Sequence, residues 1–210
     1  MLPSELMNGI VSKARILKKT IVLPDATDER AIQAAKLLAD GGIAAPILIG
    51  NPRTIEEQAK KNGTLLSGIR VVDPATSEKL SDFSHVFFNL RKEKGIKFED
   101  AQKQMTNPLF FGAMMVREGM ADGSVAGSLS TTGDVLRAAI QVIGLAENIT
   151  VVSSFFLIIF PQQVYSFADC AVVRRLLQNP GVAAESRRAT DDLRRRLETR
   201  ICWSCYGRSR

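Results

Sequence analysis

The chain has 210 residues, of which 45% are hydrophobic and 24% are charged, and a formal net charge of +6. This length allows one good core, or one domain and part of a second, and the composition is ordinary for a globular protein. One histidine, and one cysteine (Cys170) before residue 174, exclude a disulfide framework and a metal-ligand set.

The positive charge is confined to the end of the chain. Residues 1–173 hold 18 Lys and Arg against 18 Asp and Glu, whereas residues 174–210 hold ten Arg, two Asp and two Glu. We therefore expect 174–210 to be an Arg-rich tail that is disordered or unrelated to the fold before it. Segment 185–200 could form a short helix, and no strand is expected after it.

Neither the start of the chain nor its most apolar stretch resembles a membrane segment. The first residues, MLPSELMNGIVSKAR, lack a long apolar run behind basic residues, so no secretory signal is expected. The most apolar stretch, 149–160, is about half as long as the roughly 20 residues that span a bilayer. We expect a cytoplasmic protein.

Strand-like and helix-like segments alternate along the body. Short β-branched runs occur at 19–24, 45–50, 69–74 and 123–127, and the segments between them have helical spacing. The helical segments are 28–42, a stretch from Pro52, 77–95, two helices within 98–123, and 132–144.

This alternation predicts an α/β fold with three layers, in which helices cover both faces of a mostly parallel sheet. Runs 149–160 and 164–173 look like two further strands joined through 160–163. The predicted domains are therefore 1–148, the incomplete start of a second domain at 149–173, and the tail at 174–210.

The best candidate site is the segment AGSLSTTGDVLRAAIQ at 126–141, where a strand end leads through hydroxyl residues into a helix. The first N–H groups of a helix lack internal partners and attract anions, and an early Arg137 suits phosphate. In the alternative interpretation, Thr132 or Asp134 merely caps the helix and Arg137 is solvated.

A second candidate is NLRKEKG at 89–95, where Arg91 lies near the end of a helix. The alternative here is simple compensation of the helix dipole. His85 is interpreted as a packed or surface helix residue. The C-x-x-C at 202–205 lacks the setting of a redox or zinc site.

Several stretches together resemble the phosphate acetyltransferases of the phosphate acetyl/butyryl transferase superfamily. They are LPDATDERAIQAAKLLADGGIAAPILIGN (23–51), DPATSEKLSDFSHVFFNLRKEKG (73–95), AMMVREGMADGSVAGSLSTTGDVLRAAIQVIG (113–144), VSSFFLI (152–158) and FADCAVV (167–173). The resemblance covers about residues 10–173 and is not seen beyond them.

The resemblance implies two α/β domains of the isocitrate/isopropylmalate dehydrogenase-like type, with the active site between them. It implies reversible acetyl transfer between coenzyme A and inorganic phosphate, in which coenzyme A is a substrate and no metal or other cofactor is needed. Two family arginines fall on Arg91 and Arg137, and the family's phosphate-side loop falls on Ser128, Ser130, Thr131 and Thr132.

The resemblance also implies substrate partners, namely coenzyme A, phosphate and acetyl phosphate, and a homodimer. Family members continue with most of a second domain, including the catalytic base, so the catalytic residues are not assigned here and this chain is expected to be truncated and inactive. A shift of reading frame near Val173 would explain the Arg-rich tail. The alternatives are a phosphate butyryltransferase and a basic-tail nucleic-acid-binding module.

Overall fold

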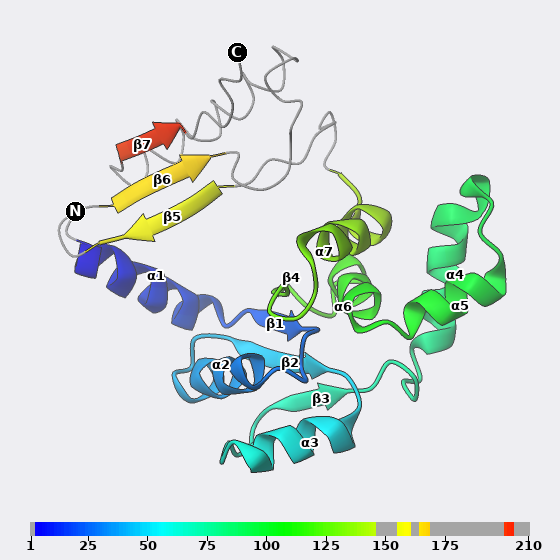
Figure 1. Ribbon diagram of the computed structural model, residues 1–210, viewed down its shortest axis with the longest axis horizontal. Coiled ribbons are helices and arrows are strands. Elements are labelled where there is room, and N and C mark those ends of the chain that lie inside the picture. The colour runs from blue at the N-terminus through cyan, green and yellow to red at the C-terminus, as the bar shows by residue number, and fades with distance from the viewer. Residues whose placement is uncertain (1–2, 146–154, 161–163, 169–199, 204–210) are drawn as a thin grey trace, which may run out of the picture. The chain divides into compact units, whose positions relative to one another are not determined.

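The computed structural model describes residues 3–145, 155–160, 164–168 and 200–203 (Figure 1). The chain divides into two compact units, residues 13–144 and residues 1–12 with 145–210. The predicted continuations of strands over 149–154 and 169–173, the possible helix up to residue 199, and Cys205 lie outside the described residues.

Four parallel strands form the sheet of the unit 13–144. They are β1 (Thr20–Leu23), β2 (Ala45–Ile49), β3 (Arg70–Val72) and β4 (Gly123–Ser124), in the order β3-β2-β1-β4. In the register, Val22 of β1 lies opposite Ile47 of β2 on one side and Ser124 of β4 on the other. The outer strand β4 is only two residues long.

Helices precede, connect and follow these strands. They are α1 (Pro3–Leu17), α2 (Glu29–Asp40), α3 (Pro52–Lys61), α4 (Leu80–Arg91), α5 (Phe98–Met105), α6 (Pro108–Arg117) and α7 (Thr132–Ala138). A 3-10 turn follows α4 at Lys92–Lys94, and a π-helical turn, Ala139–Ile143, continues α7. None of the helices in the described part of the chain is long and apolar enough to cross a membrane.

Local sequence sets where two of these helices begin. Asn51-Pro52 and Asn107-Pro108 each place an Asn at the N-cap and a proline at the first helical position. The Asn51 side chain accepts from the Arg53 N–H at 3.0 Å, and that of Asn107 accepts from the Leu109 N–H at 2.9 Å. Such caps and prolines favour helix initiation.

The sheet is covered on both faces because its strands alternate. Leu23 and Leu48 point to one face, where they pack with Ile32, Ile55 and neighbours from α2 and α3. Val22, Ile47 and Ile49 point to the other face, toward α4, α5, α6 and α7. The predicted three-layer α/β fold is confirmed.

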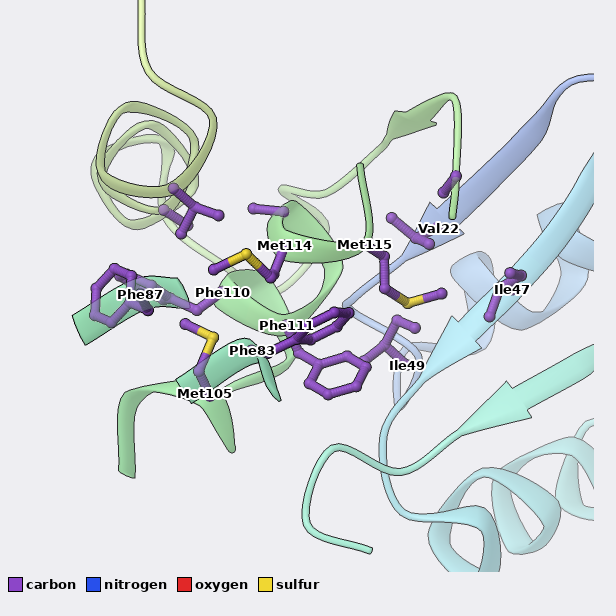
Figure 2. Close-up of a cluster of buried hydrophobic side chains, with 14 of the residues drawn as sticks. Val22, Ile47, Ile49, Phe83, Phe87, Met105, Phe110, Phe111, Met114 and Met115 are labelled. Atoms are coloured by element: carbon purple, nitrogen blue, oxygen red, sulfur yellow. The ribbon is translucent and has the colours of Figure 1, made fainter. Parts of the chain in front are cut away.

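Figure 2 shows the larger of the two clusters, in which aromatic and methionine side chains from α4, α5 and α6 meet the sheet. The rings of Phe83 and Phe111 lie 5.0 Å apart, and those of Phe87 and Phe110 lie 5.7 Å apart. Gly112 lets α6 approach β1 closely, because a Cβ there would lie 3.2 Å from Pro24 Cγ. This contact holds α6 directly against the end of β1.

The second sheet belongs to the other unit. Strands β5 (Phe155–Ile159) and β6 (Val164–Ala168) pair antiparallel, as the predicted connection through 160–163 requires, and β7 (Arg200–Trp203) pairs parallel to β6. The expectation of no strand after 185–200 is therefore wrong. Ile201 and Trp203 have strong β-propensity, which the many arginines around them obscured. Helix α1 is not among the predicted elements.

Phe111→Ala should strongly lower the free energy of unfolding, because Phe111 is 1% exposed and its removal leaves a cavity. Core Phe→Ala changes cost about 3–5 kcal/mol of unfolding free energy. Urea unfolding followed by far-UV circular dichroism measures it.

The matched control is Leu37→Ala on α2, because Leu37 is 72% exposed. Its free energy of unfolding should change by less than about 1 kcal/mol. Equal losses in the two variants would show that the cluster is not packed as described.

Candidate functional site

The candidate site lies at the carboxyl ends of β1 and β4. Because β1 has β2 on one side and β4 on the other, the connections leaving the sheet here diverge. In open α/β sheets ligands bind in the crevice at such a point. Asp25 follows β1, and the loop Gly127–Thr131 follows β4 and leads into α7.

The carboxylate of Asp25 holds the loop to the end of β1. Its Oδ2 accepts from the backbone N–H groups of Gly127 at 2.6 Å, Ser128 at 2.9 Å and Leu129 at 3.3 Å. Its Oδ1 accepts from Ser130 Oγ at 2.5 Å. Gly127 has φ +115°, a conformation that favours glycine and lets consecutive N–H groups converge.

These hydrogen bonds outweigh the effect of burial on Asp25. The residue is only 7% exposed, and burial by itself raises its carboxyl pKa. The Ser130 hydroxyl and the three loop N–H groups lower the pKa further than burial raises it, so that the pKa is below its usual value. At neutral pH Asp25 is therefore ionised, and the neutral donors of the loop stabilise its negative charge.

A second carboxylate extends the same connection. Asp28 caps α2 by accepting from the Arg30 N–H at 2.9 Å, and its Oδ2 accepts from Arg30 Nη2 at 2.6 Å. The Nη2 group of Arg30 also donates to the Ser128 carbonyl oxygen at 2.9 Å. The Arg30 hydrogen bonds lower the pKa of Asp28 to about 2. Two acidic residues of the β1–α2 connection thus hold the loop.

The start of α7 is capped by Thr131, not by Thr132 or Asp134 as the capping interpretation expected. Thr131 Oγ1 accepts from the Asp134 N–H at 3.2 Å and donates to Asp134 Oδ2 at 2.7 Å. Because Thr131 is the N-cap, Thr132 is the first residue of α7. Arg137, one turn on, pairs with Asp134 at 3.2 Å.

The outward groups of the loop remain for a ligand. Thr132 and Gly133 are exposed, and the first N–H groups of a helix have no intrahelical acceptor. Arg137 is also exposed, and its ion pair with Asp134 joins two solvated side chains. The start of α7 therefore exposes N–H donors and a threonine hydroxyl, and Arg137 is exposed further along the same helix.

Arg91 lies apart from this cluster. It is the last residue of α4 and is half-buried. Among the described residues, no hydrogen bond or ion pair links it to the loop or to Arg137. However, Phe83 and Phe87 of α4 pack in the same core cluster as Ala138 of α7, so both arginines lie on helices that cover one face of the sheet.

The other candidates from the sequence have structural roles or none. The exposed His85 stacks on Phe98 with ring centroids 4.6 Å apart, as expected of a packed or surface helix residue. Within the described ranges, no group of three or more His, Cys, Asp or Glu side chains could hold a metal ion.

Sequence reasoning did not assign Asp25, Asp28 or Arg30 to the site. A signal was present, because two aspartates follow directly after a predicted strand whose carboxyl end meets that of 123–127. Polar residues at that edge of a parallel sheet are expected to converge. What the sequence could not give is which loop N–H groups these carboxylates accept from.

The chain is similar to proteins of one family. A family model described as "Phosphate acetyl/butaryl transferase" matches residues 5–183. The phosphate acetyltransferase of Acetivibrio thermocellus is 40% identical over 174 residues, which cover 80% of this chain and 52% of that protein. The phosphate acetyltransferase of Thermoanaerobacterium thermosaccharolyticum is 39% identical over 186 residues, 86% of this chain and 54% of that protein.

Solved structures agree with the fold. A phosphotransacetylase from Streptococcus pyogenes has a TM-score of 0.73 and 30% identity, covering 81% of this chain and 52% of that chain. The EutD phosphotransacetylase from Staphylococcus aureus, at 24% identity, has a TM-score of 0.74 over 99% of this chain and 74% of that chain.

These matches also show how much of its relatives the chain covers and where the family match ends. The chain spans about half the length of the curated relatives it matches. The family match runs to residue 183, which is ten residues past the point, about residue 173, where the resemblance was expected to end.

The lowered pKa of Asp28 predicts a specific pH dependence. A carboxylate whose folded pKa is about 2, against 3.8 unperturbed, stabilises the fold above pH 3.8 and loses that contribution as the pH falls through 2. Asp28→Asn keeps an N-cap but removes the charge. The urea midpoint of the variant should therefore fall less than that of wild type when the pH is lowered from 4 to 2.

The control is Asp40→Asn, which removes an exposed carboxylate paired with Lys36 one turn away. Its pH profile should parallel that of wild type. A profile of Asp28→Asn that also parallels wild type would refute the charged role of Asp28.

Proposed function

The chain belongs to the phosphate acetyl/butyryl transferase family, and on that premise we propose that it binds phosphate for acyl transfer between coenzyme A and inorganic phosphate. The proposed phosphate groups are those assigned from the resemblance, the loop residues Ser128, Ser130, Thr131 and Thr132 together with Arg137. Arg91 is the second proposed cation.

One observation carries the proposal. The loop at the diverging strand ends is fixed by Asp25, while α7, which follows it, exposes Thr132, the N–H groups of its first turn, and Arg137. Oriented N–H donors and a guanidinium bind a phosphate dianion well. Ser130 and Thr131 act from inside this arrangement, because their hydroxyls are engaged by Asp25 and Asp134.

The arrangement suits the charge changes of the proposed reaction. The coenzyme A thiol gives up its proton to a base, and its sulfur attacks the acetyl carbonyl of acetyl phosphate. The carbon–sulfur bond forms, the carbon–oxygen bond breaks, and phosphate leaves with its electron pair. Groups that bind the leaving phosphate lower the barrier when they are already in place. The base is not assigned to a residue of this chain.

Arg137 is available for such a ligand. Its partner Asp134 is exposed, and exposed ion pairs are worth only about 0–1 kcal/mol. A phosphate dianion offers two or more oxygens to the guanidinium fork, which binds such acceptors bidentately. Exchange of Asp134 for phosphate therefore costs little.

The two curated relatives named above are phosphate acetyltransferases, which favours acetyl over the butyryl alternative. The comparisons do not favour a nucleic-acid-binding module. A homodimer, a cytoplasmic location and a domain boundary near residue 148 stay predictions.

The proposal predicts that Arg137→Ala weakens binding of inorganic phosphate by about tenfold or more, the usual cost of losing a charged hydrogen-bond donor. Isothermal titration calorimetry on the full chain measures the affinity. Acetyl phosphate should compete with phosphate, and acetate alone should not, because the site recognises the phosphate group.

Arg53→Ala is the matched control, since Arg53 is an exposed arginine at the start of α3 and its loss changes the net charge equally. Its phosphate affinity should stay within about twofold of wild type. Equal weakening in both variants would mean that phosphate responds to net charge and not to this loop.

A further inference from the structure

Asp25 is one of the buried polar residues in the described part of the chain, and its hydrogen bonds run to the loop. It accepts from three backbone N–H groups and from the hydroxyls of Ser128 and Ser130 in a single loop, although it lies more than a hundred residues away in sequence. The preceding residue, Pro24, lies where α6 comes close to the end of β1 at Gly112. The carboxylate therefore follows directly after a close contact between the end of β1 and α6.

The loop N–H groups that donate to Asp25 could instead bind an anion. Consecutive N–H groups beside a left-handed glycine form a concave anion site, and a phosphate could occupy it. With Asp25 present, the N–H groups of Gly127, Ser128 and Leu129 are taken. An external anion is left with the outer side of the loop.

We propose that Asp25 is a positioning residue, which fixes the loop Gly127–Ser130 in one conformation and directs phosphate to its outer side, beside Thr132 and Arg137. This inference rests on the proposed function. Asp25 acts without touching the ligand, because its contacts run to the inner side of the loop. The nearby Arg30 reinforces it by donating to the Ser128 carbonyl oxygen.

The structure offers a matched control for this role. Asp122 also joins β1 to the β4 region through a carboxylate, since it accepts from the Thr20 N–H at 2.8 Å and from Lys19 Nζ at 2.5 Å. Asp122 precedes β4 and Thr20 begins β1, so this connection lies at the amino end of the strands, opposite the loop. Its removal affects the sheet without releasing the loop.

The test compares full-length wild type, Asp25→Ala, Asp25→Asn and Asp122→Ala. Inorganic phosphate affinity is measured by calorimetry, and amide hydrogen exchange is measured by NMR. Asp25→Ala should weaken phosphate binding about tenfold or more and speed exchange at Gly127, Ser128 and Leu129 by a similar factor. Asp122→Ala should leave both properties of the loop within about twofold of wild type.

Asp25→Asn keeps an acceptor for the loop amides and can donate to Ser130 Oγ, so it should recover part of the affinity. If Asp25→Ala does not fold, Asp25→Asn still tests the inference, with a loss between those of wild type and Ala expected. Phosphate affinity that is unchanged or tighter in a folded Asp25 variant overturns the positioning role.

The two proposals fail in different ways. If wild type binds no phosphate, the proposed function falls, while the exchange rates still decide whether Asp25 fixes the loop. If wild type binds phosphate and the Asp25 variants exchange and bind as wild type does, the proposed function stands and the inference is refuted.

Discussion

A buried carboxylate needs donors, and a glycine-led loop with three inward N–H groups needs an acceptor. Asp25 and the loop Gly127–Ser130 satisfy each other, and the arrangement of the candidate site depends on that pairing. Leaving the buried carboxylate without donors would cost more than a typical hydrogen bond contributes. The pairing therefore fixes where the loop lies and which of its groups face outward.

The rest of the unit places these partners. Parallel pairing of β1 with β4 brings the two strand ends together, and packing of α6 against Val22 and Pro24 holds the end of β1. The aromatic and methionine cluster in Figure 2 links α4, α6 and α7 to the same face of the sheet. The site is thus built on close-packed elements, and the Thr131 cap sets where its helix begins.

Much of this was predictable from the sequence, and the reasons for success and failure are physical. Alternating β-branched runs and helical spacing gave the three-layer fold, because periodicity reports directly which face is buried. The hydroxyl loop was named as a candidate site, and the structure places it after the carboxyl end of β4. The helix cap was expected at Thr132 or Asp134 and lies at Thr131, whose hydrogen bond with the Asp134 N–H is local. Asp25 was not assigned because its hydrogen bonds join segments more than a hundred residues apart. Strand β7 was missed because tertiary pairing overrode an unfavourable composition.

The most direct test of the account is an NMR titration of the amides with inorganic phosphate. The account predicts that the largest chemical-shift changes occur at Thr132 and Gly133 and at the Arg137 guanidinium. The amides of Gly127 and Ser128, already held by Asp25, should change little. Changes centred on the inner amides, or on residues away from this loop, would contradict the claim that Asp25 presents the outer side of the loop to phosphate.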